Sequence, residues 1–97
     1  MGTMENGQRE IIRQNLGNLL EDLDPKRLMS FLFKEFIITE DDIESLNLIR
    51  TRKEKSEQLL LTLQRRGPRA FPALVEGLKE SGKPWLANLL LKEGKCN

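Results

Sequence analysis

The sequence predicts an all-α domain in which six short helices form an antiparallel bundle. Apolar residues recur at spacings of three and four along almost the whole chain, as they do in helices with one buried face. No segment alternates with period two over a useful length, so a sheet has no support. The length of 97 residues suits one domain with one core, and the short connections favour antiparallel neighbours.

The clearest boundary separates the first two predicted helices. The stripe of the first consists of Ile11, Ile12, Leu16, Leu19, Leu20 and Leu23. Gly17 interrupts this helix at a cost of about 1 kcal/mol relative to alanine, so we expect a bend or a close helix contact there. Asp24 followed by Pro25 then provides an N-cap and a first-turn proline. The stripe of the second helix consists of Leu28, Phe31, Leu32 and Phe36.

Start and stop signals also define the third and fourth helices. Thr39, followed by three carboxylates, provides a hydroxyl cap and negative charge at the positive end of a helix dipole. Ile43 and Leu46 should face the core. A polar run over residues 50–58 leads into the fourth apolar stripe, formed by Leu59, Leu60 and Leu63. Gly67 can end this helix in the left-handed conformation.

The last two helices follow a corner that is rich in glycine, proline and arginine. Residues Phe71, Leu74, Val75 and Leu78 repeat the helical spacing, with Gly77 tolerated among them. We expect the regular helix to begin near Ala70, where Pro72 is tolerated, and to end at Ser81 and Gly82. Pro84 begins the last helix, which Gly94 should end. Its apolar residues are Trp85, Leu86, Leu89 and Leu90.

The composition argues against an enzyme, a metal site or a cofactor site. The chain contains no histidine, and its one cysteine, Cys96, has no neighbouring base to activate it. The carboxylates from Glu40 to Glu44 lack the ligand spacing of a calcium loop, and the segment RRGPR lacks the Walker pattern. A lone cysteine forms no intramolecular disulfide, and the apolar runs are too short to cross a membrane. We therefore expect a cytoplasmic protein.

Charge is balanced overall but unevenly distributed along the chain. Sixteen basic and fifteen acidic residues leave a net charge of +1, which is small for a general polyanion binder. The predicted basic face comprises Arg9, Arg13, Arg50, Arg52, Lys53 and Lys55. The predicted acidic face comprises Asp22, Asp24, Glu40, Asp41, Asp42 and Glu44. Two faces of opposite charge can join different molecules in a heterologous contact. The alternative interpretation is that these charges belong to ordinary solvated helix surface.

The basic cluster at the start of the fourth helix favours a heterologous contact over ordinary solvated surface. Arg52, Lys53 and Lys55 lie near the positive end of the helix dipole, where cations are unfavourable by a few tenths of a kcal/mol. Stability alone does not select them, so they are candidates for contact with a partner.

Two segments of the sequence resemble the caspase recruitment domain, a six-helix module of the death-fold superfamily. The similarity is strongest in EQLLLTLQRRGPRAFPALVEGLKESG and extends to the opening REIIRQNLGNLLEDL. It is greatest to the prodomains of initiator caspases. The segment LLEDLDPKRLMSFLFKEF also has some similarity to pyrin domains, a minor alternative. The resemblance implies a death-fold bundle with a bent or split first helix, as a single domain over residues 1–97 with an ordered core at about 9–92.

The resemblance also implies a function in homotypic assembly. Such a domain binds another of its kind, catalyses nothing itself and brings attached caspase-type enzymes together in apoptosis or inflammatory signalling. A common contact in the family joins basic residues on helices one and four to acidic residues on helices two and three. By position, these residues are Arg13, Arg52 and Lys53 on one side and Asp24, Glu40, Asp41 and Glu44 on the other. A second contact uses the corner between helices four and five, which carries Arg65, Arg66 and Arg69.

Two alternatives to recruitment remain. A stand-alone inhibitor or adaptor of the same fold could cap an assembly instead of enlarging it. The corner arginines could also bind nucleic acid or acidic lipid, but the one aromatic residue close to them, Phe71, lies in an apolar helical stripe. We therefore expect another caspase recruitment domain as the partner, with possible self-assembly, and neither nucleic acid nor a membrane.

Overall fold

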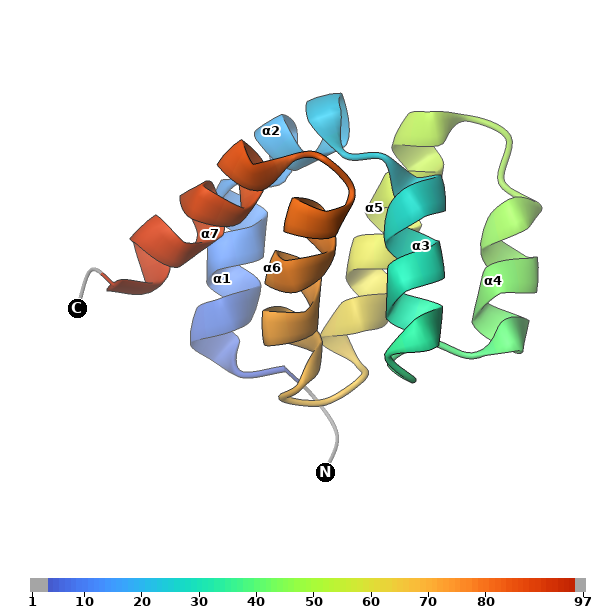
Figure 1. Cartoon of the computed structure of the whole chain (residues 1–97), viewed down its shortest axis with the longest axis horizontal. Coiled ribbons are helices and arrows are strands. Elements are labelled where there is room, and N and C mark those ends of the chain that lie inside the picture. Colours follow the sequence, from blue (N-terminus) through green and yellow to red (C-terminus); the bar gives the residue numbers. More distant parts are fainter. Residues whose placement is uncertain (1–3, 96–97) are drawn as a thin grey trace.

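The computed structural model describes residues 4–95, with side chains up to Leu91. Helices are the regular structure of this part of the chain, and they surround a leucine-rich core (Figure 1). The all-α bundle predicted from the sequence is thereby confirmed. The helices are α1 (Asn6–Gln14), α2 (Leu16–Asp22), α3 (Pro25–Lys34), α4 (Glu40–Asn47), α5 (Arg52–Gln64), α6 (Ala70–Glu80) and α7 (Pro84–Lys95).

The first predicted helix is split into α1 and α2, as the resemblance implied. The break lies at Asn15 and not at Gly17, so the predicted position was wrong. The side-chain Nδ2 of Asn15 donates to the carbonyl oxygen of Ile11 at 2.9 Å. Asparagine side chains compete with helical backbone bonds in this way, which explains the break. Gly17 makes no close helix contact either, because a Cβ atom built on it meets nothing within 4 Å.

The predicted capping signals of α3 and α4 are confirmed. Asp24 caps α3 by accepting a hydrogen bond from the backbone N–H of Arg27, and Pro25 is the first helical residue. Thr39 forms a capping box with Asp42, in which each side chain accepts from the other residue's backbone N–H. Local side-chain chemistry thus sets where both helices begin.

The corner between α5 and α6 also follows the prediction. Gly67 has a φ of 99°, the left-handed value expected of it, and Gly82 at the next corner has a φ of 84°. Helix α6 begins at Ala70, which makes Pro72 its third residue. Proline is tolerated there, because the first amides of a helix have no intrahelical partner. Helix α7 continues to Lys95, so Gly94 does not end it.

Two aromatic residues that were expected in the core lie at the surface. Helix α3 ends before Phe36, which adopts a φ of 64° and is 92% exposed. The N–H groups of Phe36 and Ile37 donate to Phe33 and Leu32, so Phe36 occupies the left-handed position of a Schellman motif. This conformation costs a residue with a Cβ atom roughly 1 kcal/mol or more. Trp85 is 47% exposed, and its indole Nε1 donates to Asp22 at 3.2 Å.

The core depends on a close approach of α3 and α6. Gly77 of α6 lies against Leu28 and Phe31 of α3, and a Cβ atom built on Gly77 would collide with Cδ1 of Leu28. Leu28 is fully buried, so its side chain has no free space into which to turn. At the other side of the bundle, the buried Met4 donates its N–H to Gln64 at 3.0 Å and ties the start of the chain to the end of α5. Residues that precede α1 therefore also contribute to the core.

The two glycines inside helices should respond oppositely to alanine. Gly77→Ala should lower the free energy of unfolding by about 1–3 kcal/mol, because it overpacks the α3–α6 contact. Gly17→Ala should raise it by up to about 1 kcal/mol, because the new methyl group enters open space and alanine favours the helix. Chemical denaturation of both variants checks this pair. A Gly77→Ala protein as stable as the native chain would contradict the packing described here.

Candidate protein-interaction surfaces

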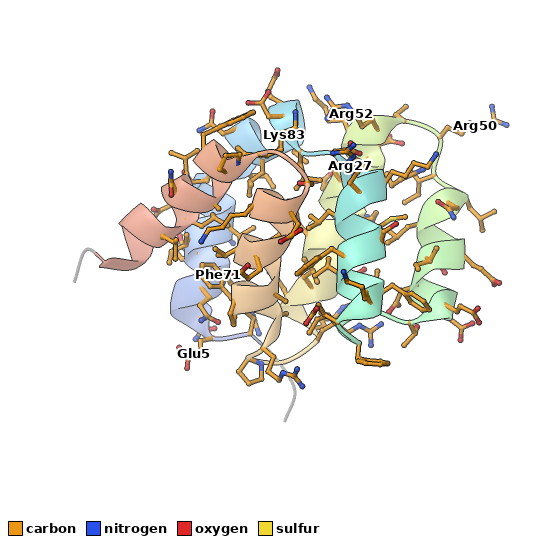
Figure 2. The ribbon with its side chains drawn as sticks, in the orientation of Figure 1. Glu5, Arg27, Arg50, Arg52, Phe71 and Lys83 are labelled. Atoms are coloured by element: carbon orange, nitrogen blue, oxygen red, sulfur yellow. The ribbon has the colours of Figure 1, made fainter. Side chains whose placement is uncertain are left out.

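The predicted basic residues are distributed over three places in the fold. Arg9 and Arg13 lie on α1, and Lys53 and Lys55 lie on α5. Arg50 lies in the α4–α5 connection, where Figure 2 shows it pointing away from the bundle and apart from Arg52. Arg9 and Arg13 line a hollow that α1 shares with α5, whereas Lys53 and Lys55 are not among its lining residues and Arg50 lies on another part of the surface.

Arg52 has a structural function that the sequence did not reveal. Its guanidinium group donates to the backbone oxygens of Leu23 at 2.8 Å and Glu21 at 3.0 Å. These carbonyls follow or close α2, where backbone acceptors lack helical partners. Arg52 therefore ties the start of α5 to the end of α2. These hydrogen bonds give Arg52 a stabilising function at this helix start, so the prediction that stability does not select its charge was wrong.

The predicted acidic face is divided between the two ends of α3. Asp22 and Asp24 precede α3, whereas the carboxylates of α4 follow it after a short turn (Figure 1). Ten helical residues separate these ends by about 15 Å. Asp22 accepts the hydrogen bond from Trp85, and Asp24 caps α3, so both have internal functions. The exposed carboxylates gather instead on α4, at Glu40, Asp41 and Glu44.

One residue of the predicted acidic face is paired with one of the corner arginines. The Nη2 atom of Arg66 lies 2.5 Å from Oδ1 of Asp42, and the Asp42 side chain is only 15% exposed. Asp42 is also the residue that completes the capping box of α4. This ion pair joins the α5–α6 corner to the start of α4. Arg65 and Arg69 remain exposed at the same corner.

Two surface features were not predicted. The first is a hollow of about 400 Å³ between α1 and α5, hereafter the α1–α5 hollow. It is lined by Asn6, Arg9, Glu10, Ile12, Arg13, Leu16, Glu57, Leu60, Leu61 and Gln64. Leu61 is 45% exposed and lies outside the buried stripe of α5. The sequence signal for this hollow was the position of Leu61 in the run Leu59–Leu61 but outside that stripe.

The second feature is a pair of exposed aromatic side chains where α3 turns towards α4. Phe33 is 42% exposed, and Phe36 is almost fully exposed. Together they form the aromatic corner, which Lys34 and Glu40 also line and which has the exposed carboxylates of Glu35 and Asp41 next to it in the sequence. The helical spacing predicted that Phe36 lies in the core. That prediction required α3 to continue to Phe36, so the exposed corner was not expected.

The described residues offer surfaces for contact and no metal centre. No group of three or more potential metal-ligating side chains comes together among them. None of the helices in residues 4–95 is long and apolar enough to cross a membrane. Cys96, the one candidate nucleophile considered in the sequence, lies outside the described residues.

Comparisons with known proteins identify the family of this helical chain. The family model described as caspase recruitment domain matches residues 9–93. The chain is 26% identical over 87 residues to cell death protein 3 of Caenorhabditis remanei. This match covers 90% of this chain and 17% of that protein. It is 30% identical over 89 residues to caspase-2 of Gallus gallus. This match covers 92% of this chain and 21% of that protein. The chain thus spans about a fifth of the length of these relatives. It belongs to the caspase recruitment domain family, and as such it is a homotypic protein-interaction module of caspase signalling.

Proposed function

We propose that this domain binds a second caspase recruitment domain and thereby clusters caspase-type proteins, as the prodomain of an initiator caspase does. The observation that carries the proposal is the separation of exposed charge on the folded chain. Cations outnumber the interspersed carboxylates on α1 and α5, whereas every charged residue of α4 is a carboxylate. Two surfaces of opposite charge on one molecule favour contact between different molecules, because each finds its complement on a neighbour.

The contacts that hold the helices together reduce the set of residues proposed for binding a partner. Arg52 and Asp42 hold the fold together, so we assign the binding contacts to neighbours that remain available. On the basic side these are the exposed Arg13 and Lys53 with the half-buried Arg9, and on the acidic side the exposed Glu40, Asp41 and Glu44. Arg65 and Arg69 are proposed for a second contact at the α5–α6 corner.

The proposed mechanism is an increase in local concentration. The domain supplies no catalytic group in this proposal and acts only by holding attached proteins together. Tethering through a short linker gives effective concentrations in roughly the millimolar range, which promotes dimerisation that free monomers do not reach. We propose that this takes place in the cytoplasm, which suits a chain with one cysteine and no possible internal disulfide.

A substitution at Lys53 tests binding without changing stability, whereas a substitution at Arg52 changes both. Lys53→Glu should weaken binding to the matched segment of Gallus gallus caspase-2 by about tenfold or more at low salt, because it reverses a charge on the proposed contact. Its melting temperature should stay close to that of the native chain. Arg52→Glu should lower the melting temperature as well, because it removes two hydrogen bonds to α2. Titration calorimetry and thermal melts measure the two effects.

A control variant and the size of the complex complete this test. Lys79→Glu reverses an exposed charge on α6, away from the proposed contact, and should leave binding unchanged. Complexes that grow with concentration in light scattering support recruitment, whereas complexes of fixed size would favour a stand-alone regulator. Normal binding by Lys53→Glu would remove the basic surface from the proposal. Tight binding to RNA or anionic vesicles at low salt would favour the electrostatic alternative instead.

A further inference from the structure

The aromatic corner is difficult to explain by stability alone. Phe36 exposes nearly all of its side chain and also occupies a left-handed backbone position, with a φ of 64°. Glycine or asparagine is the usual residue at this position of a Schellman motif. A phenylalanine there combines backbone strain with an exposed apolar surface. This combination indicates that the ring is covered when the domain is bound to a partner.

The charges around the ring describe the surface that would cover it. Glu35, Glu40 and Asp41 flank the corner and are all exposed. The one nearby cation on α3, Lys34, lies over the ring of Phe31 with its Nζ atom 5.7 Å from the centroid. A matching surface needs an apolar depression with basic residues at its edge, because an aromatic anchor is most effective where the surrounding contacts exclude water.

The α1–α5 hollow of the same chain has these properties. A phenyl ring fits a cavity of about 150 Å³, and the hollow has a volume of about 400 Å³. Apolar side chains lie in the hollow, with Ile12 and Leu60 buried and Leu61 partly exposed. Arg9 and Arg13 line the hollow.

The balance of charge around the hollow also suits an acidic partner. Lys53 lies one helical turn before Glu57 on the same face of α5. The lining itself carries two cations, Arg9 and Arg13, against two carboxylates, Glu10 and Glu57, and Lys53, one turn beyond the lining, adds a third cation. Arg13 approaches Glu10 only to 3.9 Å, and both side chains are more than half exposed, so this pair holds Arg13 weakly.

We propose that Phe36 of one copy inserts into the α1–α5 hollow of a second copy of this chain. The inference rests on the proposed homotypic function and adds an apolar anchor to the contact between charges. The corner lies where α3 turns towards α4, and the hollow lies between α1 and α5, so one copy can use both at once (Figure 1). Such a heterologous contact repeats from copy to copy and forms a ring or a filament.

Two variants test the two sides of this contact separately. Phe36→Asn removes the anchor and suits the left-handed backbone, so it should raise the melting temperature while weakening self-association by about tenfold or more. Leu61→Glu puts a carboxylate at the hollow and should weaken self-association to a similar degree, because the corner it faces is acidic. Sedimentation velocity over a range of concentrations at low salt measures the association, and circular dichroism confirms the helical content.

The mixture of both variants gives the sharpest result. The Phe36→Asn protein keeps an intact hollow, and the Leu61→Glu protein keeps an intact corner. An equimolar mixture should therefore form a one-to-one complex and no larger species. Leu48→Asn and Leu91→Glu are matched controls, because they change other exposed leucines outside both surfaces and should associate like the native chain.

Three outcomes would overturn this inference. They are native self-association by Phe36→Asn, failure of the mixture to form a complex, and a native chain that stays monomeric at every concentration. Each leaves the proposed homotypic function to be judged by the caspase-2 titration, which requires no self-association. Loss of binding in that titration with intact self-association would instead restrict the domain to contacts between its own copies.

Discussion

The fold depends on the contact between α3 and α6 at Gly77. The absence of a side chain on Gly77 lets Leu28 and Phe31 of α3 reach the backbone of α6. Helix α6 is the most deeply buried helix described here, with Ala70, Leu74 and Leu78 fully covered. Because α3 is held against it, the two ends of α3 are fixed as well. One end carries the Asp24 cap beside the Arg52 contact to α2, and the other carries the Schellman turn that exposes Phe36.

Charged residues in this domain divide into those that hold helices together and those that remain available to partners. Arg52 closes the end of α2, Asp42 caps α4 and pairs with Arg66, and Asp22 accepts from Trp85. Apart from the local cap at α4, these contacts join segments 24 to 63 residues apart in the sequence, so they stabilise the bundle and not one helix. The exposed cations of α1 and α5 and the exposed carboxylates of α4 then lie on different helices. A near-neutral chain can in this way still present two surfaces of opposite charge.

The sequence predicts features that depend on local chemistry and misses those that depend on distant neighbours. The caps at Asp24 and Thr39 and the left-handed Gly67 follow from side chains within a few residues, so they could be predicted. The end of α3 before Phe36 could not, because helical spacing is consistent with one more turn. The function of Arg52 was also missed, since its acceptors lie 29 and 31 residues away in the sequence. Gly77 was read as merely tolerated, because nothing in the sequence shows which residue of another helix lies against it.

A dilution series of isotope-labelled native protein, followed by amide NMR spectra, tests the heterologous contact most directly. As copies separate, the signals that shift should belong to two regions: the aromatic corner with the start of α4, and the facing sides of α1 and α5 around Leu61. Signals from the α6–α7 side should stay in place. Shifts confined to that side, or a single self-matching patch that excludes Phe36, would contradict the proposed contact.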